Sequence, residues 1–577
     1  MNIYKNRKAL SQITLVFCFA YLIFLMIASL QWRIDTHHDG IMFLPAILGK
    51  SNNLPQDSVF YFYGIAQPLF EGLIFKFLPI SIINYRLIAF ALIMLTGYFL
   101  YKIISLKLSK TISLVFSLTW MFANPTWANS FESVPVSIQT PWPNLWIQTF
   151  FISCVYIILR SKLETFSSLL LVSTMAGSMP FFRMQGIVYS FYVFILVLIV
   201  NKTRLLRYTI FSIVVIFAWL TLIQFHGGLK LYLSNTIFYP RNFYSTFTSH
   251  DYVLDFFIHS ITYYFVCAAL LISYLCISNI TYIKTYFWRK FLFLNLCLLA
   301  ICAAIQFEFN QWLEIIIKNS SSIILDSFLL LAVIFAIIIF ATDYRARNRS
   351  DLSTKTILGF YSLASISNLF FQFPLPDLGH RWWSSAILVL FIAEATTIDM
   401  YQKFKLQQNL IKKTIVMGCI ASIFFSGLQG IKFLSFERSE LVVSGTNIYN
   451  GIKIPKRDKE TIEKFNSSLK TLRYLENLGV KINYNCRDGL YYLRDSNYVI
   501  ESKNFLYSPG KEREVLQYVN SVESKVTFYC NVDSENIKNL FLFKYFVIGS
   551  NQTDLFVVND SYIYQKLNDF FEYEDFS

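Results

Sequence analysis

Two carboxylates and two histidines lie close together near the N-terminus, in the run Asp35-Thr-His37-His38-Asp39. They follow directly after the apolar stretch 12–32, at a position where ionisable groups are costly unless they are paired or used. A carboxylate placed there can take a proton from a hydroxyl group, which is general base catalysis. The alternative is ordinary loop polarity at a membrane surface. Because only 15% of the chain is charged, the cluster favours the functional interpretation.

The same residue types also bind divalent cations, since histidine nitrogen and carboxylate oxygen are both metal ligands. Adjacent ligands alone do not close a coordination shell. We therefore predict no metal ligand set, and a divalent cation stays open as the one candidate cofactor.

A lone arginine, Arg183, stands two residues before Gln185 and has no acidic neighbour nearby in the sequence. A planar guanidinium group suits a phosphate, because it offers several donors in a fixed fork. A side chain that anchors a helix end by reaching the membrane surface is an equally weighted alternative.

A second loop, 372–383, combines turn-forming residues with a compact polar and aromatic group. Tryptophan at a membrane interface is usually an anchor. The adjacent histidine–arginine pair is not explained by anchoring, and aromatic planes also stack on sugars. The loop therefore favours a carrier or sugar site made of His380, Arg381, Trp382 and Trp383.

The composition shows what must position these residues. Hydrophobic residues make up 55% of the 577 residues, and the mean hydropathy is +0.47. A soluble globular protein carries about 25% charged residues, so the low charge excludes a disordered chain and an ordinary cytosolic enzyme. Continuous apolar runs also exclude an outer-membrane barrel, whose strands alternate. The sequence predicts an all-α polytopic membrane protein.

A membrane-spanning helix needs about 20 mostly apolar residues. Thirteen stretches are candidates, and Pro125 and Pro180 lie near the ends of two of them. The predicted spans are 12–32, 87–104, 111–128, 145–160, 166–181, 186–200, 207–225, 253–278, 291–307, 322–342, 355–372, 384–400 and 414–434.

The basic residues predict the orientation of these spans. Twenty-two lysines and arginines lie at the N-terminus and in every second turn, whereas the loop 129–144 has none. Positive charge marks the cytoplasmic side, so we expect the N-terminus inside and the C-terminus outside. Because this charge lies in short loops between apolar segments, it does not indicate a nucleic-acid-binding face.

The tail 435–577 is long enough for one soluble domain. Helix-like stretches at 458–478 and 512–522 alternate with strand-like stretches at 480–484, 525–530, 545–548 and 554–558, which predicts a C-terminal α/β domain. Gly479 is expected to end the first helix. Cys486 and Cys530 are the only cysteines of the tail, and the sequence leaves open whether they pair.

The first outer loop, 31–86, is long for a connection between two spans. Its ordered motif is His38-Asp39-Gly40…Ala46…Gly49…Asp57…Tyr63-Gly64…Pro68-Leu69. This motif, after one span and before many, resembles the first loop of the GT-C class of integral-membrane glycosyltransferases, in particular bacterial members linked to surface polysaccharides. The chain departs from the commoner paired acids of that class, because Gly40 follows Asp39.

The resemblance implies a function. A member of this class would take a hexosyl or pentosyl group from a polyprenyl-phosphate donor on the outer face of the membrane. It would pass the sugar to a cell-envelope glycan or a lipid-linked acceptor. Asp39 is then the expected base, with Asp35 second and His37 and His38 beside it. The expected donor-binding residues are Tyr63, Asp57, Arg183, Gln185, His380, Arg381, Trp382 and Trp383.

These expectations divide the chain into a transferase-like membrane domain, 1–434, and an extracytoplasmic accessory domain, 435–577. The protein would reside in the bacterial inner membrane. An O-antigen or capsule polymerase or ligase is one alternative, although such proteins tend to carry their arginine-rich loops in the second half. A polysaccharide or lipid transporter is another, but the sequence shows no internal repeat and its polar cluster lies at the surface. A non-catalytic envelope protein with a sensory tail is the third.

Overall fold

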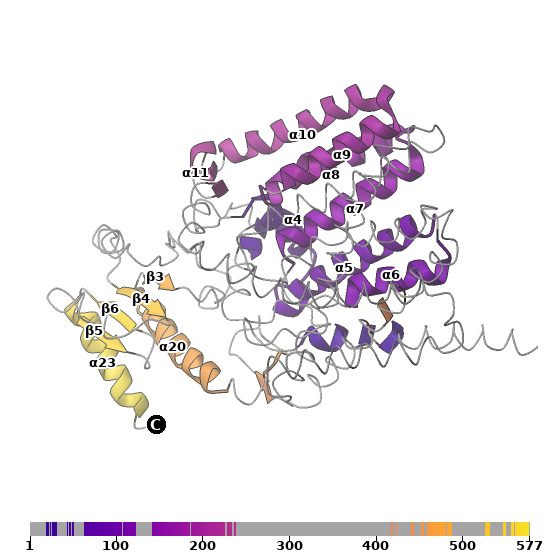
Figure 1. Ribbon diagram of the computed structural model, residues 1–577. Coiled ribbons are helices and arrows are strands. Elements are labelled where there is room, and N and C mark those ends of the chain that lie inside the picture. The colour runs from indigo at the N-terminus through magenta and orange to yellow at the C-terminus, as the bar shows by residue number, and fades with distance from the viewer. Residues whose placement is uncertain are drawn as a thin grey trace, which may run out of the picture.

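The structure is a computed structural model of the whole chain, drawn in Figure 1. Most of its described residues fall in the first half of the membrane part and in pieces of the tail. The described residues are 19–21, 23–24, 26–31, 43, 45–47, 49–50, 63–106, 108–122, 141–184, 186–225, 228–233, 236–237, 416, 419–420, 423, 440–442, 452–454, 459–480, 482–486, 526–530, 546–549, 555–558 and 560–575.

The described membrane part is helical, as predicted. Its elements are α4 (Ala66–Phe75), α5 (Ile82–Ile104), α6 (Lys110–Phe122), α7 (Pro143–Ser161), α8 (Phe166–Phe182), α9 (Gly186–Val200), the 3-10 turn η1 (Lys202–Arg204), α10 (Leu205–Phe225) and α11 (Leu229–Leu233). Among the described residues, three helical stretches are long and apolar enough to cross a membrane, namely α5, α7 and Lys202–Phe225. The predicted spans from 253 to 400 lie outside the described residues, so the total of thirteen stays a prediction.

Local signals explain where the helices begin. The Ser81 side chain caps α5 by accepting a hydrogen bond from the backbone N–H of Asn84 at 3.1 Å. Thr165 caps α8 in the same way, through Ser168. The cap at Ser81 starts α5 five residues before the predicted start at 87. Arg86, expected at the end of the first outer loop, therefore lies inside a helix.

The helices pack side by side in the order α6, α5, α7, α8, α10, and α9 packs against both α7 and α8 (Figure 1). Small and hydroxylated residues lie at the contacts. Ser117 donates to the carbonyl of Gly97 at 2.5 Å, and the hydroxyls of Thr96 and Thr149 lie 2.7 Å apart. Close contacts of this kind are typical of helix packing within membranes.

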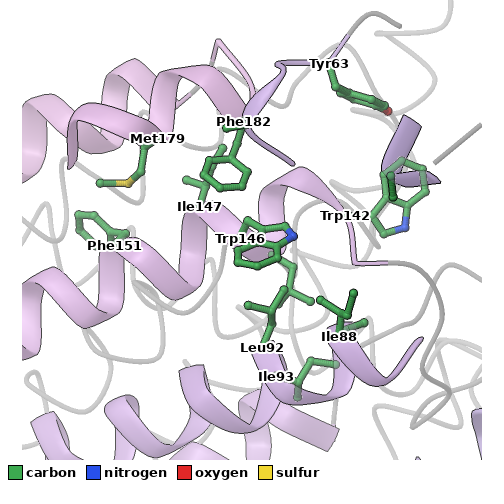
Figure 2. Close-up of a cluster of buried hydrophobic side chains, with 14 of the residues drawn as sticks. Tyr63, Ile88, Leu92, Ile93, Trp142, Trp146, Ile147, Phe151, Met179 and Phe182 are labelled. Atoms are coloured by element: carbon green, nitrogen blue, oxygen red, sulfur yellow. The ribbon is translucent and has the colours of Figure 1, made fainter. Parts of the chain in front are cut away.

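Aromatic side chains fill the end of the bundle where α7 begins. The Trp146 ring stacks on Phe182 of α8 at a centroid distance of 5.5 Å. In Figure 2 the same ring stands between Phe182 and the aliphatic side chain of Leu92 from α5. Trp146 thus joins three helices near the first outer loop.

The tail contains a four-stranded sheet with the order β3-β4-β6-β5. Its strands are β3 (Ile482–Cys486), β4 (Val526–Cys530), β5 (Phe546–Gly549) and β6 (Leu555–Val558), close to the four predicted strands. β3 and β4 are parallel, and the other neighbours are antiparallel. The predicted helix at 512–522 lies outside the described residues.

Two helices accompany this sheet, and their buried residues form its core. The helix α20 (Lys459–Asn477) matches the prediction and ends at Gly479, which has a φ of +70°. The helix α23 (Ser561–Asp575) was not predicted, and neither was the antiparallel pair β1 (Glu440–Val442) and β2 (Ile452–Ile454). Buried positions come from both helices and the central strands, namely Leu472, Leu475, Val526, Phe528, Phe556, Val558, Ile563 and Leu567.

Candidate active site

The first outer loop is joined to the end of α8 by a backbone contact. The N–H of Gly64 donates to the carbonyl of Phe182 at 2.9 Å. A Cβ atom at position 64 would lie 1.8 Å from the carbonyl oxygen of Phe181, which is closer than any real contact. Only glycine therefore lets the loop approach α8 this closely, and the loop residue Tyr63 comes to lie beside Arg183.

Arg183 follows the last residue of α8 and contacts only neutral groups among the residues that the structure describes. One guanidinium nitrogen, Nη1, donates to Oδ1 of Asn144 at 3.3 Å. The guanidinium carbon lies 5.4 Å from the centroid of the Tyr63 ring. An aromatic face and an amide orient a cation without neutralising it. Within the described part of the chain, the positive charge of Arg183 is thus positioned by its partners and not neutralised by them.

The start of α7 adds to the positive character of this site. Asn144 lies in the first turn of α7, directly after Pro143. Trp142, at the N-cap position of this helix, provides no side-chain hydrogen bond to it. A helix N-terminus carries a partial positive charge. Pro143 has no N–H group and the N–H of Leu145 donates to the carbonyl of Trp142 at 2.9 Å, so the contribution of this helix start is its dipole. The Trp142 ring packs edge-on against Tyr63 at 6.1 Å. The partial charge of the α7 N-terminus therefore adds to the charge of Arg183 at this position.

A buried polar network holds α4 against the start of α7. Nε2 of Gln67 donates to the carbonyl of Pro141 at 2.7 Å and to Oε1 of Glu71 at 2.9 Å. Nε1 of Trp146 donates to the same Glu71 oxygen at 3.0 Å. Gln67 and Glu71 are fully buried. The network fixes the segment that carries Tyr63 relative to the segment that carries Asn144.

The protonation of Glu71 follows from its burial. α4 is only ten residues long and does not span a membrane. Burial raises the pKa of the Glu71 carboxyl well above its usual value, against opposing hydrogen bonds from Trp146, Gln67 and Tyr85. Removing a carboxylate from water disfavours its charged form. The site therefore favours the neutral carboxyl group, which needs no cation beside it.

Two glycines bring an earlier part of the loop against α4. A Cβ atom at Gly49 would lie 2.2 Å from the carbonyl oxygen of Pro68, and one at Gly72 would lie 2.3 Å from the carbonyl carbon of Gly49. The segment that follows the Asp35–Asp39 cluster is therefore in backbone contact with α4. Phe43, in the same part of the loop, stacks on Tyr85 of α5 at a centroid distance of 4.7 Å, so this part of the loop also contacts α5.

Arg86 connects the bundle to the helix that precedes the acidic cluster. Its side chain is 1% exposed, and Nη1 donates to the carbonyl of Leu30 at 3.0 Å. Leu30 lies five residues before Asp35. A buried guanidinium group bonded to a main-chain carbonyl holds that helix end in place.

Of the predicted site residues, the described part of the chain includes Tyr63 and Arg183, and it brings them together. The rest lie outside the described residues: Asp35, His37, His38, Asp39, Asp57, Gln185, His380, Arg381, Trp382 and Trp383. Their roles and their convergence on one site stay predictions. Within the described ranges, no group of three histidine, cysteine or acidic side chains is placed to hold a metal ion.

Several polar residues of the site were not predicted from the sequence. Gln67 lies within the Tyr63–Leu69 part of the loop motif, whereas its partner Glu71 lies outside the motif. An acid on a short apolar helix carries the same signal that identified Asp39, because ionisable groups are rare in this chain. Asn144 gave no such signal, since nothing in its surrounding sequence links it to Arg183.

Comparison with known proteins gives a structural similarity. No protein-family model matches the chain, and no curated protein matches it in sequence. Among solved structures, the chain is similar to ArnT from Cupriavidus metallidurans bound to undecaprenyl phosphate, with a TM-score of 0.43 and 10% identity over 95% of this chain and 98% of that chain. For ArnT in the apo state the TM-score is 0.44, with 9% identity over 96% and 98% of the two chains. At these values, the assignments below rest on the residues of this chain.

Proposed function

We propose that the chain is an integral-membrane glycosyltransferase that uses a polyprenyl-phosphate sugar as its donor. The observation that carries the proposal is the placement of Arg183 between the Tyr63 ring and Asn144, at the start of α7 and beside the first outer loop. A phosphate held there would lie next to the loop that carries the acidic cluster. The neutral partners of Arg183 support an anionic ligand, because they leave its charge available.

In this proposal the phosphate group of the donor binds Arg183 and the N-terminus of α7. Asp39 takes the proton from the acceptor hydroxyl, whose oxygen then attacks the anomeric carbon of the sugar. The bond from that carbon to the phosphate oxygen breaks, and the polyprenyl phosphate departs with both electrons of the bond. Arg183 stabilises the charge that grows on the departing phosphate.

The remaining residues of the proposal come from the sequence. Asp35 is the second candidate for the base, and His37 and His38 orient the carboxylate or contact the phosphate. The other donor-binding candidates are Asp57, Gln185, His380, Arg381, Trp382 and Trp383. The acceptor would be a cell-envelope glycan or a lipid-linked oligosaccharide.

The proposal also includes a location and an orientation. We place the protein in the bacterial inner membrane, with the N-terminus in the cytoplasm and residues 435–577 outside. The 22 basic residues in alternate turns support this orientation. Alkaline phosphatase fused after residue 440 should be active, because the enzyme folds only outside the cytoplasm. An active fusion to a cytoplasmic reporter at the same position would contradict the orientation.

Arg183 provides the direct test of the phosphate site. Purified protein in detergent is titrated with undecaprenyl phosphate, and transfer is measured with the corresponding labelled donor. Arg183→Ala should weaken carrier binding and transfer together, and Arg183→Lys should restore only part, since lysine lacks the planar fork. Arg204→Ala, at the opposite end of the bundle, is the matched control. Unchanged binding and transfer in Arg183→Ala would overturn the assignment.

A further inference from the structure

The two cysteines of the tail occupy one rung of its sheet. In the parallel pair of β3 and β4, the register places Cys486 opposite Cys530. Nothing in the proposed transfer reaction uses either residue. Neighbouring strands lie about 4.8 Å apart, and two cysteines can be bridged when their Cα atoms lie roughly 4.4–6.8 Å apart. The general spacing of neighbouring strands falls within that window.

Their position along the strands also suits a covalent bridge. Cys486 is the last residue of β3 and Cys530 is the last residue of β4. They are the last paired positions that the structure describes in these two strands. Along a strand, every second residue shares a face, which groups position 530 with Val526 and Phe528. Val526 and Phe528 are fully buried, so this face of β4 packs into the core of the tail.

We propose that Cys486 and Cys530 form a disulfide bond in the mature protein. The proposal rests on the outward orientation of the tail, because disulfides persist in the oxidising compartment outside the cytoplasm. Each thiol gives up one proton and one electron as the sulfur–sulfur bond forms. The acceptor is the disulfide of a thiol–disulfide oxidoreductase, which is reduced to a dithiol by exchange.

The bond would fix a strand that has one neighbouring strand in the described part of the tail. In the described sheet β3 lies at an edge and pairs only with β4. A long connection, 487–525, separates the two strands in the sequence, and closing it costs conformational entropy each time the tail folds. A covalent link at the last rung restricts the unfolded tail and keeps β3 in register.

Peptide mapping of the full-length protein tests the bond directly. Membranes are treated with N-ethylmaleimide, and the denatured protein is digested with trypsin without reductant. Cleavage after Lys481 and Arg487 releases peptide 482–487, and cleavage after Lys525 and Lys538 releases peptide 526–538. We expect one species with the summed mass of both peptides less two hydrogens, which separates on reduction. Maleimide on both peptides before reduction, or a link from either cysteine to a different one, would overturn the proposal.

Variants show whether the bond acts on the fold. Cys486→Ser, Cys530→Ser and the double variant should lower the protease resistance of the tail equally, because each removes the same bond. Asn485→Ser, one rung earlier opposite Tyr529, is the matched control and should have no such effect. Additive losses in the double variant would mean that the two residues act separately.

The orientation and the bond can fail independently. An active phosphatase fusion together with maleimide-labelled peptides would overturn the disulfide and leave the orientation standing. An inactive fusion together with labelled peptides would overturn both.

Discussion

Two sets of polar contacts, one at each end of the helix bundle, differ in their exposure to water. At the end where α7 begins, Gln67 and Glu71 are fully buried and Arg86 is 1% exposed. At the opposite end, Asn201 donates to the carbonyl of Lys162 at 2.7 Å, and Arg204 donates to the carbonyl of Glu164 at 3.2 Å, both at exposed positions. The hydrogen bonds are similar, but water can replace only the exposed ones.

The difference indicates which end must hold a defined geometry. A buried donor or acceptor that loses its partner costs about 1–3 kcal/mol, whereas an exposed one is solvated at little cost. The exposed end only closes turns: the one between α7 and α8 places both Lys162 and Leu163 in the left-handed region, at φ of 47° and 58°. The buried end fixes three segments of the chain around Tyr63 and Arg183.

The largest effect is expected from Asp39, the proposed base. Asp39→Asn should lower transfer by about 10²–10⁴-fold, because the amide keeps the shape of the carboxylate but cannot accept the proton. Labelled sugar transferred to the acceptor measures the rate, and the elution of the detergent-solubilised protein on gel filtration checks the fold. Asp35→Asn should be equally or less severe. Wild-type transfer by Asp39→Asn would remove the base from the proposal.

Glu71 should affect stability as well as activity. Glu71→Ala leaves Nε1 of Trp146 without this acceptor and removes one of the hydrogen bonds of Gln67, which keeps its bond to the carbonyl of Pro141. A buried donor that loses its acceptor costs about 1–3 kcal/mol. Glu71→Gln keeps one acceptor oxygen at the same position and should recover most of the loss. The midpoint of thermal unfolding in detergent measures both variants. A Glu71→Ala protein as stable as Glu71→Gln would show that the network does not hold α4.

The same residue predicts a pH dependence. Because the pKa of Glu71 is higher in the folded protein than in the unfolded chain, the folded state binds more protons above the ordinary carboxyl pKa of 4.5. Stability from this group should therefore fall as the pH rises from about that value towards the raised pKa. Unfolding midpoints between about pH 5 and pH 8 should decline less steeply in Glu71→Gln than in the wild type. Parallel curves would contradict the burial of an ionisable group at this position.

The smallest effect is expected at the exposed end. Arg204→Ala removes one hydrogen bond to a main-chain carbonyl that water can satisfy, so stability should change by at most about 0.5 kcal/mol. Transfer should remain at the wild-type rate. Lost transfer with unchanged stability would mean that the two ends are not as different as their burial indicates.

The sequence predicts those features of this molecule that depend on local signals. Apolar runs place α5, α7 and α10, and Gly479 ends α20 because a left-handed residue suits glycine. The missed helix α23 also carried a local signal, since the Asp560 side chain accepts hydrogen bonds from the N–H groups of Tyr562 and Ile563. The mixed composition of residues 561–575 did not indicate a helix.

The candidate site could be predicted only in part, because its contacts join segments far apart in the chain. Arg183 is recognisable as an isolated cation, and Tyr63 belongs to a loop motif. Asn144 orients Arg183 only because α7 packs against α8. Glu71 holds the α4 segment next to Tyr63 only because α4 packs against α7. Such packing is a property of the tertiary structure and leaves no periodic pattern in the sequence.

The backbone contact at Gly64 has a consequence for engineering. Residue 64 and residues 181–182 meet without a side chain between them, so neither segment can be exchanged alone. A first loop grafted from another protein would fit this bundle only if it carried glycine at the position of Gly64. The backbone of the grafted loop would also have to accept the close approach of the carbonyl groups of residues 181–182. Chimeras that swap the loop together with the end of α8 should therefore assemble, whereas chimeras that swap either one should not.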